Sequence, residues 1–178
     1  MRVVALTGTP GTGKTTVAGE LSGMGYSIVH VDELIRLLNV RTTAERGTSA
    51  IAVDVTDLKR KAISHWKAVR EKQVVVAGHL SHYAGAEGAV VLRCAPSVLE
   101  KRLEARRWSR EKIRENVQAE VLDVILVEAA ESLGWVREID TTRSTPAETA
   151  AAVREALEGK MNNHPVASRW SGEIEKWF

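Results

Sequence analysis

The chain has 178 residues, of which 44% are hydrophobic and 27% are charged. These proportions fit one globular domain and exclude a disordered or fibrous protein. With 25 basic and 23 acidic residues, the net charge of +2 is too balanced to favour nucleic acid as the main partner, so any basic patch must be local.

Short apolar runs alternate with longer helix-like segments, a pattern typical of an α/β fold in which helices cover both faces of a parallel sheet. The run VVVA at 74–77 lacks in-and-out alternation, as expected for a strand that is buried on both sides. Five strands are predicted, over Val3–Leu6, Ser27–Val31, Val74–Ala77, Ala89–Arg93 and Val136–Ile139. Helices are predicted over Lys14–Met24, Glu33–Leu38, Val55–Lys72, Val98–Trp108, Arg110–Leu133 and Pro146–Leu157.

Two helix starts carry a capping-box pattern. Thr145 offers a cap hydroxyl, Pro146 suits the first helical position, and Glu148 can reach back to the amide of the cap. Ser97 and Glu100 have the same spacing.

The helical pattern breaks after residue 159, which divides the chain into a domain over 1–159 and a tail over 160–178. Trp170, Ile174 and Trp177 would share one face of a tail helix. This aromatic stripe either docks on the parent domain, the simpler interpretation, or binds a partner.

The single cysteine, Cys94, cannot form an internal disulfide, and the sequence opens without a secretory signal pattern. We therefore expect a soluble, cytoplasmic protein, with Cys94 as a small buried hydrophobe rather than a reactive thiol. No apolar stretch has the length of a membrane span, so we expect no membrane insertion.

The strongest motif is GTPGTGKT at residues 8–15, which satisfies G-x-x-x-x-G-K-[ST] between a predicted strand and a predicted helix. Its glycines let successive backbone N–H groups face an anion, and the following helix adds its positive end. Lys14 can bridge the β- and γ-phosphates, and the Thr15 hydroxyl can bind Mg²⁺. The alternative, an ordinary glycine-rich turn, would not account for Lys14 and Thr15 at these positions. A nucleoside triphosphate is therefore the expected ligand.

Phosphoryl transfer depends on charge neutralisation, and arginines recur along the chain. Arg36 follows the second strand, and Arg93 ends the fourth. Arg102 and Arg106 are four residues apart, so on a helix they would point the same way, toward a phosphate chain. A solvated basic surface paired with nearby glutamates is the alternative.

The segments GTPGTGKTT, VDELIR, VVVAGH, LR, RLEARRWSREKI and NVQAEV occur in this order. Together they resemble the adenylate kinase isoenzyme 6 family, the coilin-interacting nuclear ATPase group, from Met1 to about Leu157. The resemblance implies a P-loop NTPase of the nucleoside monophosphate kinase type, with an acceptor-binding (NMP-binding) insert at about 32–65 and a short lid at about 106–112. It also implies γ-phosphoryl transfer from ATP to AMP, ATPase activity, and a link to small ribosomal subunit maturation through a ribosomal protein.

By position, the resemblance assigns the acceptor phosphate to Arg36. Arg106 is the lid arginine and also contacts ATP, with Arg102 beside it, and both are implied to be catalytic together with Lys14. Asn116 and Gln118 match the helix after the lid, where a plain helix-surface role is equally compatible. The residues implied to hold the donor phosphates are Gly11, Thr12, Gly13, Lys14, Thr15 and Thr16.

The third strand departs from the family pattern, Asp-x-His. His79 is retained, but the acid is replaced by Ala77. In the family the Asp is expected to hold Mg²⁺ through water, and the His is tied to ATPase function. We expect a catalytic role for His79 beside the phosphates; a neutral histidine bonded at the end of a strand is the alternative. His82 has no assigned role.

Mg²⁺ keeps several waters, so another carboxylate can substitute for the missing acid. Glu33, three residues before Arg36, is the leading candidate, with Thr15 as the direct ligand. Asp32 and Asp54 are alternatives, and Asp32 could instead cap the helix.

Three functions remain compatible with the sequence. The first is an adenylate kinase acting on ATP and AMP with Mg²⁺. The second is a ribosome assembly factor switched by its nucleotide state. The third is a P-loop kinase for another small acceptor, since fold does not fix substrate.

Overall fold

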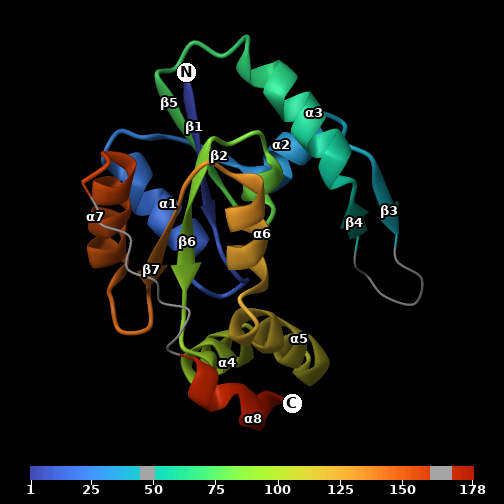
Figure 1. Cartoon of the computed structure of the whole chain (residues 1–178), viewed down its shortest axis with the longest axis vertical. Coiled ribbons are helices and arrows are strands. Elements are labelled where there is room, and N and C mark those ends of the chain that lie inside the picture. The colour runs from blue at the N-terminus through green and yellow to red at the C-terminus, as the bar shows by residue number, and fades with distance from the viewer. Residues whose placement is uncertain (45–50, 161–169) are drawn as a thin grey trace.

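A computed structural model describes residues 1–44, 51–160 and 170–178. Its centre is a sheet of five parallel strands in the order β2-β5-β1-β6-β7 (Figure 1). The strands are β1 (Arg2–Thr7), β2 (Ser27–His30), β5 (Gln73–Ala77), β6 (Gly88–Arg93) and β7 (Val136–Asp140). The predicted five-stranded parallel sheet is confirmed.

Helices cover both faces of this sheet (Figure 1). On one face lie α1 (Lys14–Gly23) and α7 (Pro146–Leu157). On the other lie α2 (Val31–Leu37), α3 (Val55–Trp66) and α6 (Val124–Ser132). Beyond the carboxyl ends of β1 and β6 lie α4 (Pro96–Ala105), α5 (Arg110–Val121) and α8 (Ile174–Trp177).

The side chains of the central strands pack into a hydrophobic core on each face of the sheet, which is why their sequences do not alternate between apolar and polar residues. In β5, Val75 and Ala77 pack with α1, whereas Val74 and Val76 pack with α2 and α3. All four side chains are at most 3% exposed. Burying each valine side chain in such a core contributes roughly 1.5–3 kcal/mol.

Several predicted helix boundaries are wrong; the helix expected over Val98–Trp108, for example, ends at Ala105. The helix expected over 110–133 is divided in two, because Asp123 adopts a left-handed conformation (φ 56°) between α5 and α6. The helix expected to reach Lys72 ends at Trp66. The capping box at Ser97 does not form, since α4 begins two residues earlier than predicted, with Ala95 as N-cap and Pro96 in its first turn. At α7 the predicted capping box is present, with reciprocal bonds between Thr145 and Glu148.

The segment between β2 and β5 forms α2, a hairpin of β3 (Thr42–Ala44) and β4 (Ile51–Val53), and α3. The hairpin was not predicted. Gly78, just after β5, has φ 149°, and a Cβ there would lie 2.2 Å from Val31 Cγ1. Glycine thus lets the start of α2 approach the end of β5.

The tail docks on the parent domain, as the simpler interpretation expected. Trp170 is 6% exposed and packs against Ala95 and Val98, and Trp177 packs against the core between α4 and α5. The expected single helix face is wrong, because Trp170 precedes the 3₁₀ turn η3 (Ser171–Glu173), and Ile174 is 41% exposed.

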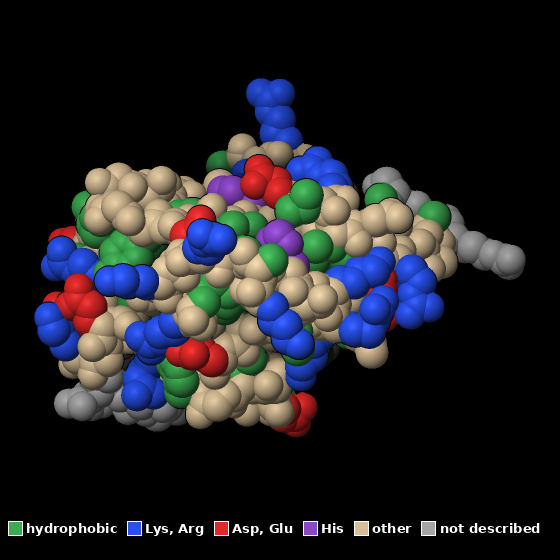
Figure 2. All heavy atoms as spheres, turned by 90° about the horizontal axis from the view of Figure 1, so that it is seen from above, with side chains coloured by type: hydrophobic (Ala, Val, Ile, Leu, Met, Phe, Trp, Pro, Cys, Tyr) green, Lys and Arg blue, Asp and Glu red, His purple; other side chains and the backbone are tan. Residues whose placement is uncertain are grey.

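Figure 2 shows the face at the top of Figure 1, where Lys and Arg side chains are spread out with Asp and Glu among them. Within the described residues, no helix combines the length and apolar character that crossing a membrane requires.

Candidate active site

The loop between β1 and α1 is packed tightly against α4. Gly11 has φ 98°, and a Cβ at this position would lie 2.7 Å from Leu99 Cδ1 and 2.9 Å from Leu103 Cδ2. Gly13 is the N-cap of α1 with φ 103°, and no side chain caps the helix. The first N–H groups of α1 are therefore left for a ligand, and the helix end favours an anion.

Lys14 folds back onto the loop. Its Nζ donates to Gly8 O at 2.6 Å and to Thr9 O at 2.9 Å. Burial lowers the Lys14 pKa to about 7; the charge of Arg106 also lowers it, whereas Glu120 and Asp32 oppose the shift. A phosphate group would reverse this shift, because it would supply the negative charge that the buried ammonium lacks.

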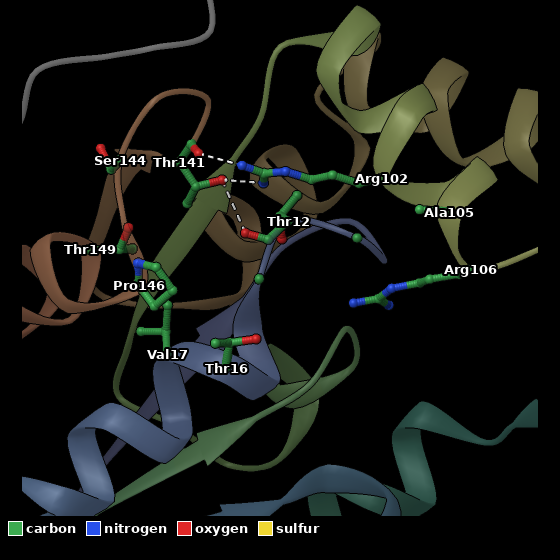
Figure 3. A pocket seen from close by; sticks show the side chains of 12 residues that line it. Thr12, Thr16, Val17, Arg102, Ala105, Arg106, Thr141, Ser144, Pro146 and Thr149 are labelled. Atoms are coloured by element: carbon green, nitrogen blue, oxygen red, sulfur yellow. Dashed lines mark hydrogen bonds between the residues drawn. The ribbon is translucent and has the colours of Figure 1, made fainter.

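A cavity of about 430 Å³ lies between the loop, α4 and the segment that follows β7 (Figure 3). Arg102 reaches it from α4, and Arg106 from the C-cap position of that helix. Arg102 donates to Thr141 Oγ1 at 3.0 Å and to Thr141 O at 2.7 Å. Arg106 extends into the open space, and its guanidinium forms no hydrogen bond or ion pair with any other described residue. The cavity is lined by Gly11, Thr12, Gly13, Thr16, Val17, Arg102, Ala105, Arg106, Thr141, Ser144, Pro146 and Thr149.

Sequence reasoning missed the side of this cavity that follows β7. Thr141 is buried, and its Oγ1 lies 3.0 Å from Thr12 O, which joins the segment to the phosphate loop. Ser144, Pro146 and Thr149 complete this wall. The available signal was topological, since the carboxyl ends of parallel strands meet at one edge of a sheet, where ligands bind.

His79 lies on the other side of the loop, where it lines a second cavity, of about 580 Å³, with Thr9 and Pro10. Desolvation of the ring lowers the His79 pKa, and the charge of Lys14 lowers it further. The ring is therefore neutral at pH 7. The replaced acid position, Ala77, is 3% exposed and packs in the core beside α1.

His82, unexplained by the sequence, is buried behind this site. Its Nδ1 lies 3.2 Å from Thr7 Oγ1, and its Nε2 lies 3.2 Å from Glu128 Oε2. Burial lowers the His82 pKa to about 4, so the ring is a neutral packing element.

The three carboxylates considered for Mg²⁺ have different surroundings in the structure. Asp32 and Glu33 are both exposed in the first turn of α2, and Asp32 acts electrostatically on both Lys14 and His79. Asp32 is not the cap, since the N-cap of α2 is His30. Asp54 instead caps α3, accepting from Asp57 N at 2.9 Å.

The other expected residues have different surroundings. Arg36 is exposed near the end of α2, and Thr15 and Thr16 are exposed in the first turn of α1. Arg93 does not face the phosphate site: it is 1% exposed and bound to carboxylates, so its predicted place in the phosphate-facing cluster is wrong.

The two polar residues on α5 bond within the protein. Asn116 donates to Lys112 O at 2.7 Å and also lines the second cavity. Gln118 donates to Trp177 O at 2.8 Å and so anchors the tail. Cys94 is buried, which raises its thiol pKa to about 11 and confirms its structural role.

We expect Lys14 to become protonated when ATP binds. At pH 8, where free Lys14 is mostly neutral, binding should take up about one proton per chain, because the phosphates restore the ammonium. Calorimetry in buffers of different ionisation enthalpy measures this uptake. Lys14→Met should abolish it; equal uptake in both proteins would contradict the assignment.

The same shift in the Lys14 pKa determines how the stability of the ligand-free protein changes with pH. The pKa of Lys14 falls from 10.5 to about 7 on folding, so the unfolded chain binds more protons between these values. The contribution of Lys14 therefore becomes more favourable as the pH rises from 7 to 10.5.

Comparison with known proteins places this site in a family. A family profile described as an AAA domain matches residues 4–123. A protein of Archaeoglobus fulgidus named "Putative adenylate kinase" is 41% identical over 97% of this chain and 94% of its own length. Proteins of the same name from Thermococcus onnurineus and Methanocaldococcus jannaschii are 38% and 34% identical, each over 98% of this chain and 94% of their length.

Solved structures agree on the fold. TT1252 from Thermus thermophilus has a TM-score of 0.57 at 17% identity, covering 91% of this chain and 98% of that one. Shikimate kinase from Bacteroides thetaiotaomicron has a TM-score of 0.53 at 17% identity, covering 88% and 98%. With its phosphate loop, its five-stranded parallel sheet and these relatives, the chain belongs to the P-loop family formed by the archaeal proteins of that name.

Proposed function

We propose that the protein transfers the γ-phosphoryl group of ATP to AMP, giving two ADP, and has an accompanying ATPase activity. The observation that carries this proposal is the cavity beside the phosphate loop, into which Arg102 and Arg106 project from one helix. The names of the archaeal relatives support a nucleotide as substrate.

On the donor side, the loop and α1 would hold the phosphates. The backbone N–H groups at Gly11 and Gly13 and the free first turn of α1 offer donors. Lys14, aligned by its bonds to the carbonyls of Gly8 and Thr9, would meet the β- and γ-phosphates with its remaining donor. The nucleoside would extend toward Thr16 and Pro146 along the lined cavity.

On the acceptor side, a phosphate oxygen of AMP attacks the γ-phosphorus, and the bond from that phosphorus to the bridging oxygen of ADP breaks. Arg36 would hold the AMP phosphate. Arg106 has no protein partner to displace within the described residues, so its charge is available to the three equatorial oxygens of the transferred phosphoryl group in the transition state. Neutral His79 would donate or accept a hydrogen bond at the phosphates without adding charge.

Mg²⁺ fits the residues that are present. The described residues contain no group of three or more His, Cys, Asp or Glu side chains that could enclose an ion. A metal here would take most of its ligands from phosphate and water, as Mg²⁺ does. Thr15 would supply the hydroxyl, and a carboxylate of α2 would meet the water shell. Glu33 is the candidate from the resemblance, but the electrostatic contact of Asp32 with Lys14 favours Asp32. The bound ion would neutralise charge on the phosphates.

A nucleotide-switched assembly factor acting with a small-subunit ribosomal protein is the second candidate, together with membership of the adenylate kinase isoenzyme 6 group. Ala77 in place of the acid favours weak kinase activity. The tail gives this candidate less support than the sequence suggested, since Trp170 and Trp177 pack on the protein itself.

Purified protein with ATP, Mg²⁺ and a panel of monophosphates tests the proposal. We expect ADP formation that depends on AMP, with two ADP formed for each AMP consumed. Hydrolysis that ignores AMP and rises with ribosomal components would favour the assembly factor. Strong turnover with a different acceptor would point to another P-loop kinase.

Arg106→Ala should lower turnover by about 10³-fold, because an arginine that meets transition-state charge contributes at least that much in related phosphotransferases. ATP affinity, measured by calorimetry, should change much less. Lys101→Ala is the matched control, since Lys101 is an exposed cation of the same helix. Unchanged turnover in Arg106→Ala would remove Arg106 from the mechanism.

Asp32→Asn should raise the Mg²⁺ concentration needed for half-maximal activity by about tenfold or more, the usual cost of losing an outer-shell partner. Glu33→Gln, one residue away, should have a smaller effect. The reverse order would assign the water shell to Glu33.

A further inference from the structure

A buried acid lies directly beneath the phosphate loop. Glu120, in the last turn of α5, is 2% exposed, and its two oxygens serve different elements. Oε2 accepts from Thr9 Oγ1 at 2.5 Å. Oε1 accepts from Arg93 Nε at 2.9 Å and from Cys94 N at 3.0 Å.

The charge of Glu120 is balanced by Arg93 at the end of β6. The same guanidinium donates to Glu138 Oε2 at 3.0 Å, to Glu120 O at 3.1 Å, and to the carboxylate of Asp123. A buried ion needs this degree of pairing, and removing one partner typically costs about 3–5 kcal/mol. The left-handed residue Asp123 turns the chain between α5 and α6 and so completes the set.

Thr9 connects Glu120 to Lys14. Its side chain is held by Glu120, while its carbonyl accepts from Lys14 Nζ at 2.9 Å and from Thr12 Oγ1 at 2.9 Å. Three bonds thus connect Arg93 to Glu120, Glu120 to Thr9, and Thr9 to Lys14.

A purely structural ion pair would not need this arrangement. A carboxylate this close to a phosphate site repels the ligand, so placing it there is unfavourable for binding unless it orients a neighbour. Oε1 of Glu120 binds Arg93 and Cys94, whereas Oε2 accepts a hydrogen bond from Thr9 in the loop.

We propose that Glu120 is a positioning residue for phosphoryl transfer: by holding the Thr9 hydroxyl, it fixes the loop carbonyl against which Lys14 is aligned. This inference rests on the proposed function and adds a residue to the same site. Glu120 also connects α5, the helix that follows the arginines of α4, to the loop.

The test compares Thr9→Val with Thr9→Ser. Valine keeps the shape of threonine but removes the hydroxyl, so we expect kcat to fall by between about tenfold and about 100-fold, the usual cost of a misplaced group, with a smaller change in KM for ATP. Thr9→Ser keeps the hydroxyl and should recover most of the lost turnover. Equal kcat values in Thr9→Val and Thr9→Ser would overturn the proposal.

Glu120→Gln and Glu138→Gln form a second matched pair. Both remove one charge from around Arg93, and Glu120 in addition accepts a hydrogen bond from Thr9 in the loop. Glu120→Gln should lower kcat with a smaller change in KM for ATP, because the amide holds the Thr9 hydroxyl less firmly than the carboxylate does. Glu138→Gln should lower stability to denaturant with little change in kcat. Parallel effects in both variants would reduce Glu120 to a structural role.

Hydrolysis of ATP does not involve the acceptor. If the wild-type protein proves inactive toward AMP, the proposed function fails, while the rates of ATP hydrolysis in Thr9→Val and Thr9→Ser still decide whether the Thr9 hydroxyl positions Lys14. If the wild-type protein is active but the variants behave alike, only the positioning role fails.

Discussion

The ion pair between Arg93 and Glu120 lies under the phosphate loop, and the geometry of the site depends on it. The loop needs glycines with positive φ and N–H groups left open to receive an anion, so its backbone contributes little beyond the bond from Thr12 N to Thr9 O to hold it in place. Support comes instead from below, where Glu120 holds Thr9, and from the side, where Leu99 and Leu103 leave room only for a glycine at position 11. Both supports come from the α4–α5 segment, which also carries Arg102 and Arg106. Loop and arginines are therefore placed by one structural unit.

The charged side chains around the loop favour the binding of a phosphate. Lys14 and Arg106 repel each other, and burial pushes Lys14 toward its neutral form. Negative charge from Glu120 and Asp32 offsets this only in part. A nucleotide with several phosphates would relieve the repulsion, recharge Lys14 and give Arg106 a partner. Binding energy and catalytic charge would then come from the same side chains, as phosphoryl transfer requires.

The sequence predicted well what is encoded locally. GTPGTGKT and the apolar runs that flank it specify strand, loop and helix within a few residues, and the capping box at Thr145 formed as expected. Features that depend on distant partners were missed. Nothing in VLDVILV signals a helix break, because the turn at Asp123 is stabilised by Arg93, thirty residues away in the chain. Spacing alone also could not show that Arg93 points inward while Arg106 points into the cavity. Thr141 lies in a loop without a motif, and only the topology of the sheet brings it, with Pro146 at the start of α7, to the phosphate loop.

The central claim is that two adenine nucleotides meet end to end at one phosphate loop. Its most direct test is calorimetric binding of diadenosine pentaphosphate, which joins the two substrates through their phosphates, compared with ATP and AMP alone. An adenylate kinase should bind one molecule per chain at least about 100-fold more tightly than it binds ATP, as expected of a ligand that fills both sites. Binding no tighter than that of ATP would show that the acceptor position does not accept an adenine nucleotide, and the account would be wrong.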